Sequence, residues 1–218
     1  PSEPGRTAAA AETLAPRTPV LCAGCPHRST YYWLSSMKMP VAGDIGCYNL
    51  GCLPPFNAQH TMGCMGASIG VLHGMAIAGV PERGVATIGD STFFHSGMPA
   101  LVNMVHNGSR GVTIIMDNGT TAMTGHQDHP GTAWSLHDTQ AAHIPIEPLV
   151  RAMGVAKIRT VNAFDLHEVK DGLTDCLDYD GPSVLITRGL CVQVAKPKTP
   201  AYTVESERCI ACGTCFRL

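Results

Sequence analysis

Two polar turns, each placed directly after a short apolar run, constrain the fold of this chain most. The runs at residues 85–88 and 112–116 are rich in Val and Ile, and the turns that follow them read Gly-Asp-Ser and Asp-Asn-Gly-Thr. A helical pattern at residues 99–106 lies between the runs. Two buried strands joined through a helix lie parallel, and open parallel sheets bind ligands at the carboxyl ends of their strands. The sequence therefore predicts a ligand site built from both turns.

The same alternation of apolar runs and helical patterns extends over most of the chain. It predicts an α/β fold, a parallel sheet with helices on both faces, over residues 20–194. The other expected elements are strands at residues 41–45 and 184–187, and helices at residues 66–78, 146–153 and 165–177. Residues 1–19 are rich in Pro and Ala, and we expect them to be a linker from a preceding domain that is missing here.

The composition of the chain argues against several classes of function. Charged residues make up 15% of the 218 residues and the formal net charge is −2, so the basic excess typical of nucleic-acid binding is missing. No apolar run approaches the roughly 18 residues of a membrane span, and the first residues lack a signal-peptide pattern. We therefore expect a cytoplasmic protein without nucleic-acid or membrane partners. Few charges together with 10 Cys suggest that neighbouring chains cover much of the surface, as in a hetero-oligomer.

The two polar turns carry the ligands that Mg2+ prefers. Asp90 supplies a charged carboxylate, Asn118 an amide oxygen and Thr120 a backbone carbonyl, and two phosphate oxygens would complete the oxygen shell. Gly89 would let the backbone approach a phosphate closely, and Ser91 begins a helix whose N–H groups favour an anion. Either motif alone is also an ordinary turn, because Gly, Asp and Asn are the usual turn residues. Their occurrence at successive strand ends favours a magnesium–diphosphate site.

The spacing of the cysteines predicts two metal centres. In a reducing compartment, many Cys indicate metal or redox chemistry rather than disulfides. A C-x-x-C pair and two distant thiols could bind either Zn2+ or an iron–sulfur cluster, and the pair could also be a thioredoxin-like dithiol; these residues are Cys22, Cys25, Cys47 and Cys191. A second set has the C-x2-C-x2-C spacing that begins a bacterial ferredoxin motif, namely Cys209, Cys212 and Cys215. Residues 195–218 are therefore expected to be a linker and a truncated ferredoxin-like [4Fe-4S] module.

Several segments, in the same order, resemble the thiamine-diphosphate-binding C-terminal part of the alpha subunits of indolepyruvate:ferredoxin oxidoreductases. These segments are LCAGCPHRSTYY, GDIGCYNLG, TMGCMGASIG, GDSTFFHSGMPAL, DNGTTAMTGHQDHPGT and CIACGTC. Within the 2-oxoacid:ferredoxin oxidoreductase superfamily, the run CPHR points to the arylpyruvate branch. Gly-Asp-Ser stands where the thiamine diphosphate motif usually reads Gly-Asp-Gly. The resemblance implies a pyrophosphate-type thiamine-diphosphate-binding domain with Mg2+ and a nearby [4Fe-4S] cluster.

The resemblance also implies roles for individual residues. Gly63 would offer its carbonyl to the aminopyrimidine, Met65 would support the bent cofactor, and His60 and Met65 are the candidate catalytic residues. The four cysteines of the first set would hold the proximal [4Fe-4S] cluster. The expected cofactor contacts are Gly63, Cys64, Met65, Gly66, Gly89, Asp90, Ser91, Thr92, Asn118, Thr120, Thr121 and Ala122.

The implied activity is the oxidative decarboxylation of arylpyruvates, such as indolepyruvate, to aryl-acetyl-CoA, with electrons passing through [4Fe-4S] clusters to ferredoxin. The implied partners are the 2-oxoacid, coenzyme A, ferredoxin, a beta subunit and a pyrimidine-binding domain that brings the activating Glu. Without that domain, we expect the chain to be catalytically incomplete. The alternatives are a non-oxidative 2-oxoacid decarboxylase, a beta subunit of the pyruvate type and an electron-transfer module without thiamine. The His-rich segment 126–143 is expected to be a mobile, solvated loop.

Overall fold

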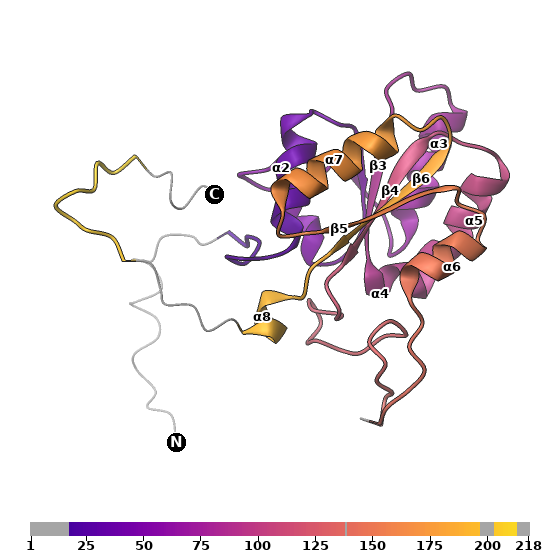
Figure 1. Cartoon of the computed structure of the whole chain (residues 1–218). Coiled ribbons are helices and arrows are strands. Elements are labelled where there is room, and N and C mark those ends of the chain that lie inside the picture. The colour runs from indigo at the N-terminus through magenta and orange to yellow at the C-terminus, as the bar shows by residue number, and fades with distance from the viewer. Residues whose placement is uncertain (1–17, 138, 197–202, 213–218) are drawn as a thin grey trace, which may run out of the picture.

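The computed structural model describes residues 18–137, 139–196 and 203–212. Its centre is a sheet of six strands, all paired in parallel, in the order β2-β1-β3-β4-β6-β5. The strands, which run through the middle of Figure 1, are β1 (Val41–Gly43), β2 (Thr61–Met62), β3 (Val85–Gly89), β4 (Gly111–Asp117), β5 (Lys157–Asn162) and β6 (Pro182–Arg188). The predicted parallel α/β fold is confirmed.

Helices cover both faces of this sheet (Figure 1). One face packs against α2 (His27–Ser36) and α7 (Leu166–Leu177), and the other against α3 (Ala67–Ile77), α5 (Met98–His106) and α6 (Ile146–Ala152). Shorter helical segments lie near the strand ends, namely η1 (Cys47–Cys52), α4 (Asp90–Thr92), η2 (Phe93–Gly97) and α8 (Val192–Ala195).

Alternate residues of the central strands belong to two apolar cores, one on each face of the sheet. In β4, Ile114 belongs to the core under α2 and α7, and Ile115 to the core under α3, α5 and α6. Both side chains are fully buried, and burial of each stabilises the fold by about 1.5–3 kcal/mol. Because these strands are buried on both faces, they read as continuous apolar runs, the pattern from which they were predicted.

The structure contains elements that were not predicted, and one predicted strand is shorter than expected. β5 was not predicted, because it is an edge strand whose partly exposed residues include Lys157 and Arg159 and break the apolar run. α2 was not predicted either, since its sequence HRSTYYWLSS contains few strong helix formers. The strand expected at residues 41–45 ends at Gly43, because Asp44 turns away from the sheet to bind the start of α3.

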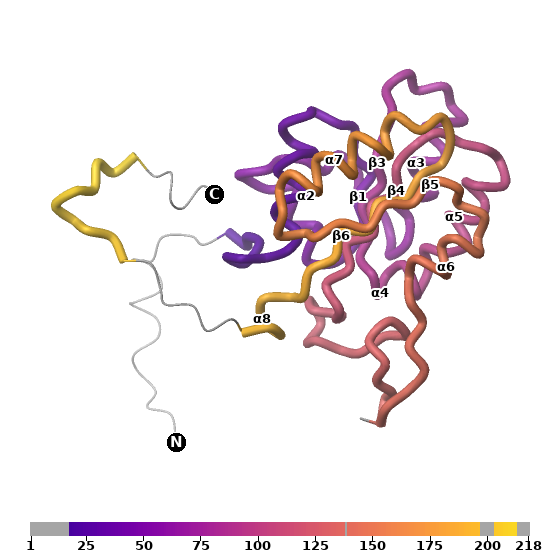
Figure 2. Tube along the Cα trace, viewed as in Figure 1, coloured from indigo at the N-terminus to yellow at the C-terminus, as the bar shows by residue number. Residues whose placement is uncertain are grey.

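The segment between β4 and α6 extends away from the sheet, as the trace in Figure 2 shows. Its described residues form no helix, and it contains two isolated bridges, Thr121 with Gln127 and Trp134 with Gln140, together with several turns. This segment starts at Asn118 and therefore begins at the predicted ligand edge of the sheet.

Some predictions fall outside the residues that the structure describes. Residues 1–17 of the expected linker and Cys215 of the second cysteine set are among them. Within the described ranges, no helix has both the length and the apolar character that crossing a membrane demands.

Candidate functional site

The parallel register of β3 and β4 brings the two predicted turns together. Gly89 lies opposite Met116 in this register, so Asp90 and Asn118 leave neighbouring strands at the same edge of the sheet. Both side chains are buried, and both line one cavity. The arrangement predicted from the alternation of strands and helices is therefore present.

The Asp90 carboxylate is held by backbone N–H groups. Its Oδ1 accepts from the Ser91 amide at 2.7 Å, and its Oδ2 accepts from the Gly119 amide at 2.8 Å. These two hydrogen bonds fix the orientation of the carboxylate. On the neighbouring turn, the Asn118 Oδ1 accepts from the Thr120 amide at 3.2 Å. A carboxylate and an amide oxygen fixed side by side suit a divalent cation.

Hydroxyl groups of several side chains line the same cavity. Thr121 Oγ1 donates to Ser91 Oγ at 2.7 Å, which links the two turns directly. Thr92 Oγ1 accepts from the Tyr48 hydroxyl at 3.1 Å. Ser91, Thr92, Thr120, Thr121 and Ala122, all predicted as cofactor contacts, line the cavity. Donors of this kind, next to a carboxylate and an amide oxygen, fit a metal-bound diphosphate.

Gly89 lines the cavity, and its lack of a side chain leaves room for Tyr48. A side chain at Gly89 would meet Tyr48, with its Cβ 2.6 Å from the Tyr48 Cε1 atom. A glycine is therefore needed at this position, because Tyr48 packs against the end of β3. Tyr48 also donates a hydrogen bond to the Ile45 carbonyl at 2.7 Å.

Asp44, which sequence reasoning missed, anchors the loop that carries Met65. This fully buried carboxylate accepts from the amide of Gly66 at 2.7 Å and from that of Ser68 at 3.0 Å, and so binds the N-terminus of α3. Gly66 has a left-handed φ of 86°, and a side chain there would collide with Ser96. Ser96 Oγ donates to the Met65 carbonyl at 2.9 Å. These contacts hold Met65 at the wall of the cavity.

Four other predicted residues do not line this cavity. Gly63 and Cys64 are exposed on the loop before α3, and Gly66 is buried at the start of that helix. His60 is exposed, and its Nδ1 accepts from the Val41 amide at 3.1 Å, an arrangement that stabilises the edge of the sheet.

A second cavity is lined by all four cysteines of the first set, Cys22, Cys25, Cys47 and Cys191. They come from three places in the chain, the Cys22–Cys25 pair, Cys47 and Cys191, and only the fold brings them together. Burial raises the pKa of the Cys25 thiol to about 12, and the neighbouring thiols Cys22, Cys47 and Cys191 add to this rise. Burial also raises the pKa of Cys47. Without a cation the Cys25 and Cys47 thiols stay protonated at neutral pH, whereas a metal centre would bind them as thiolates.

The two cavities share a wall. His27, Cys47, Asn118 and Ala122 line both of them. The Cys191 amide donates to the Asn118 carbonyl at 3.0 Å, and the Asn118 Nδ2 lies 3.4 Å from the His27 Nε2. Burial lowers the pKa of His27 to about 4, so the imidazole is neutral at pH 7. A group bound by the cysteines would therefore lie directly beside one bound at Asp90 and Asn118.

The described cysteines of the second set lie at the surface of the protein. Cys209 and Cys212 are exposed. Over residues 18–137, 139–196 and 203–212, no three His, Cys, Asp or Glu side chains lie close enough together to hold a single metal ion.

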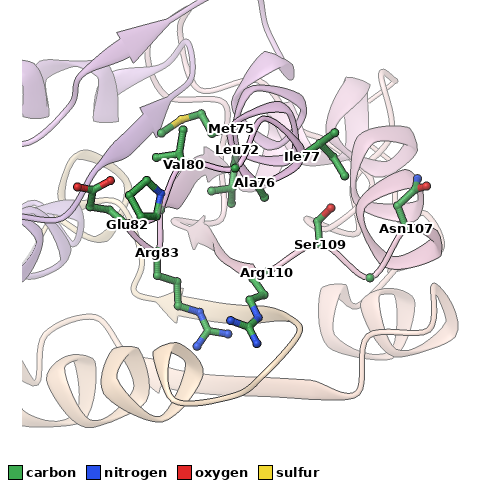
Figure 3. A pocket seen from close by; sticks show the side chains of 14 residues that line it. Leu72, Met75, Ala76, Ile77, Val80, Glu82, Arg83, Asn107, Ser109 and Arg110 are labelled. Carbon is green, nitrogen blue, oxygen red and sulfur yellow. The ribbon is translucent and has the colours of Figure 1, made fainter.

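A further cavity lies elsewhere, at the amino ends of β3 and β4 (Figure 3). Arg83 and Arg110 lie beside it with their guanidinium groups close together. Arg83 donates to the carbonyls of Leu177 and Tyr179, and Arg110 pairs with Asp180 at 2.6 Å. Both arginines are thus engaged by the turn before β6, and none of the predicted site residues lies here.

Comparisons with known proteins agree with this geometry. The model of the family "Thiamine pyrophosphate enzyme, C-terminal TPP binding domain" matches residues 44–187. The indolepyruvate oxidoreductase subunit IorA of Pyrococcus horikoshii is 40% identical over 94% of this chain and 35% of the relative. The same subunit of Methanothermobacter thermautotrophicus is 39% identical over 92% of this chain and 34% of the relative. The chain thus spans about a third of the length of these relatives, which confirm the resemblance inferred from its motifs.

Solved structures show the same fold. A 2-oxoglutarate:ferredoxin oxidoreductase from Magnetococcus marinus, with 2-oxoglutarate, coenzyme A and succinyl-CoA bound, superposes with a TM-score of 0.68 at 19% identity, covering 81% of this chain and 65% of that one. A putative thiamin diphosphate-dependent enzyme from Mycobacterium smegmatis gives a TM-score of 0.54 at 20% identity, covering 74% and 31%. With its fold, its paired polar turns and the family match over residues 44–187, this chain belongs to the thiamine pyrophosphate enzymes, as a member of the family formed by their C-terminal TPP-binding domain.

Proposed function

We propose that this chain is the thiamine diphosphate and Mg2+ half-site of a 2-oxoacid:ferredoxin oxidoreductase that acts on arylpyruvates such as indolepyruvate. The observation that carries the proposal is the shared wall between the cavity of Asp90 and Asn118 and the cavity of the four cysteines. In an oxidoreductase of this kind, the cofactor that reacts with the substrate must lie close to the centre that accepts the electrons. The relatives named as indolepyruvate oxidoreductase subunits support the substrate class.

Mg2+ would be bound by the side-chain oxygens of Asp90 and Asn118 and by the Thr120 carbonyl. The hydroxyl groups of Ser91 and Thr121, already linked at 2.7 Å, would face the diphosphate. When bound, thiamine diphosphate supplies a thiazolium that accepts the electron pair released as a 2-oxoacid loses carbon dioxide. Met65, held by the contacts of Asp44 and Ser96, would keep the ring position fixed.

The cysteine cavity would hold a [4Fe-4S] cluster that carries the electrons away. Four thiols line this cavity, and the raised pKa values of Cys25 and Cys47 mean that a strongly charged metal centre is needed to bind these two as thiolates. Cys209, Cys212 and Cys215 would belong to a separate ferredoxin-like module in residues 195–218, after a thiamine-diphosphate-binding domain of residues 20–194. Ferredoxin would receive the electrons, and coenzyme A would receive the acyl group.

The chain would work only in a larger assembly. We infer a pyrimidine-binding domain that supplies the activating Glu, a beta subunit and a cytoplasmic hetero-oligomer. Measured turnover of indolepyruvate by the 218-residue chain alone would contradict this part of the proposal.

A binding assay tests the cofactor site. Thiamine diphosphate with Mg2+ should raise the midpoint of thermal unfolding, because a ligand at about 100 times its Kd stabilises a protein by about 2.7 kcal/mol. Asp90→Ala should abolish the rise, whereas Asp171→Ala, at an exposed position on α7, should keep it. No rise in the unmodified chain would contradict the proposal.

Metal analysis tests the cluster. After anaerobic purification the chain should contain iron and sulfide, and Cys191→Ser should lose both, whereas Cys52→Ser, at an exposed thiol, should retain them. Zinc in place of iron would contradict the electron-transfer role. Thiamine diphosphate binding without iron would instead favour a non-oxidative decarboxylase.

A further inference from the structure

A histidine from the extended segment after β4 is buried against the proposed metal ligand. His129 has a side chain that is only 4% exposed, and its Nε2 lies 3.2 Å from the Asp90 Oδ2. The expectation of a solvated loop is therefore wrong for this residue, although neighbouring residues such as His126 and His137 are exposed. No motif indicated this contact, because 39 positions separate the two residues in the sequence.

The surroundings of His129 define which nitrogen carries the proton. Its Nδ1 accepts a hydrogen bond from the Gly131 amide at 3.1 Å. In a neutral imidazole one nitrogen accepts and the other donates, so Nε2 carries the hydrogen. This Nε2–H is buried and makes no well-directed hydrogen bond to any described residue, although the Asp90 carboxylate lies within reach.

The position of the ring is fixed by packing. The His129 ring lies 5.6 Å from the Phe94 ring, centre to centre, and Phe94 follows Asp90 in the same helical run. The His129 carbonyl accepts from the Thr132 amide at 2.8 Å, which closes a tight turn. Gly131 fits there because a side chain would lie 3.0 Å from both aromatic rings. The turn and the rings together hold Nε2 toward Asp90.

We propose that His129 is a positioning residue for the metal-binding carboxylate: its Nε2–H directs Oδ2 of Asp90 and leaves Oδ1 for the divalent cation. Among the described residues, Oδ2 is approached by the Gly119 amide and by His129, whereas Oδ1 is approached only by the Ser91 amide. Oδ1 therefore has more free lone-pair capacity for a metal ion. Partners that orient a metal-binding carboxylate typically contribute about 10–100-fold to metal affinity. The proposal rests on the proposed function, because it takes Asp90 as a metal ligand.

Two substitutions separate this role from a structural one. His129→Asn places its amide near the position of Nδ1, so it can keep the contact with the Gly131 amide, but it is too short to reach Asp90. His129→Gln places its amide nitrogen near the position of Nε2 and can restore the contact with Asp90. If His129 acts only within the turn, the Asn variant should bind the metal ion more tightly than the Gln variant. If it acts on Asp90, the Gln variant should bind the metal ion more tightly.

The test measures Mn2+ binding to the full chain in the presence of thiamine diphosphate, by the paramagnetic resonance signal of unbound Mn2+. We expect His129→Asn to weaken Mn2+ binding by about 10–100-fold and His129→Gln to recover most of this loss. His137→Asn, at an exposed histidine of the same segment, should bind like the unmodified chain. Equal affinity in the Asn and Gln variants, or tighter binding by Asn, would overturn the positioning role. No Mn2+ binding by the unmodified chain would overturn the proposed function itself.

Discussion

Replacement of Asp44 by Ala should both destabilise the chain and release the loop that carries Met65. Asp44 is fully buried and accepts three backbone hydrogen bonds, from Ile45 at 2.8 Å, Gly66 at 2.7 Å and Ser68 at 3.0 Å. Alanine would leave the amides of Gly66 and Ser68 buried without an acceptor. Each orphaned group costs about 1–3 kcal/mol, and bonds to a charged acceptor lie toward the upper end. The expected loss in the free energy of unfolding is therefore about 3–5 kcal/mol.

This magnitude distinguishes two roles. An ordinary helix N-cap contributes about 1 kcal/mol, so a much larger loss indicates that Asp44 organises the loop as well as the helix. The measurement is urea-induced unfolding of the metal-free chain, followed by circular dichroism. Asp44→Asn keeps one acceptor oxygen and the side-chain volume, so it should lose less than Asp44→Ala.

Asp171→Asn serves as the matched substitution at an exposed site on α7, and it should change stability by less than about 0.5 kcal/mol. A loss of only about 1 kcal/mol in Asp44→Ala would refute the reasoning, because it would show that other groups or water satisfy the two amides. The same variant should also lose the thermal shift caused by thiamine diphosphate and Mg2+.

Three further predictions concern pH, backbone conformation and thiol reactivity. Burial lowers the pKa of His27 from 6.5 to about 4, so the unfolded chain takes up a proton below pH 6.5 before the folded chain does, and the free energy of unfolding falls between these pH values. Between pH 7 and pH 4.5 the unmodified chain should therefore lose about 2 kcal/mol more of this free energy than His27→Gln. Equal losses in the two proteins would contradict the shift. Gly66→Ala should lower the free energy of unfolding in urea by about 2–4 kcal/mol, because the φ of Gly66 is 86° and a Cβ would lie 2.9 Å from the Ser96 carbonyl carbon. A change near zero would mean that the loop relaxes freely. The pKa of Cys25 is raised to about 12, so in the metal-free chain this thiol should react with iodoacetamide at pH 8 far more slowly than the exposed Cys52. Mass spectrometry of the labelled peptides measures the two rates. Similar rates would contradict the burial of the Cys25 thiol.

Local pattern was enough to predict the central strands and the position of the polar turns. Residues of β3 and β4 are apolar on both faces because helices cover both, so burial leaves a signal in the sequence itself. Parallel pairing then places Asp90 and Asn118 at one edge, since strands linked through a helix run in the same direction. The edge strand β5 left no such signal, because its partly exposed positions tolerate Lys and Arg.

The contacts that organise the site were decided by the tertiary structure. Asp44 is 22 positions from Gly66, and His129 is 39 from Asp90, and neither pair belongs to a repeating pattern that a local reading could detect. Cysteine spacing indicated a metal centre, but the convergence of four thiols on one cavity, next to the wall formed by His27 and Asn118, depends on how α2, η1 and the end of β6 pack. The physical reason is that hydrophobic periodicity records which face of each element is buried, whereas the geometry of a site depends on which buried faces meet.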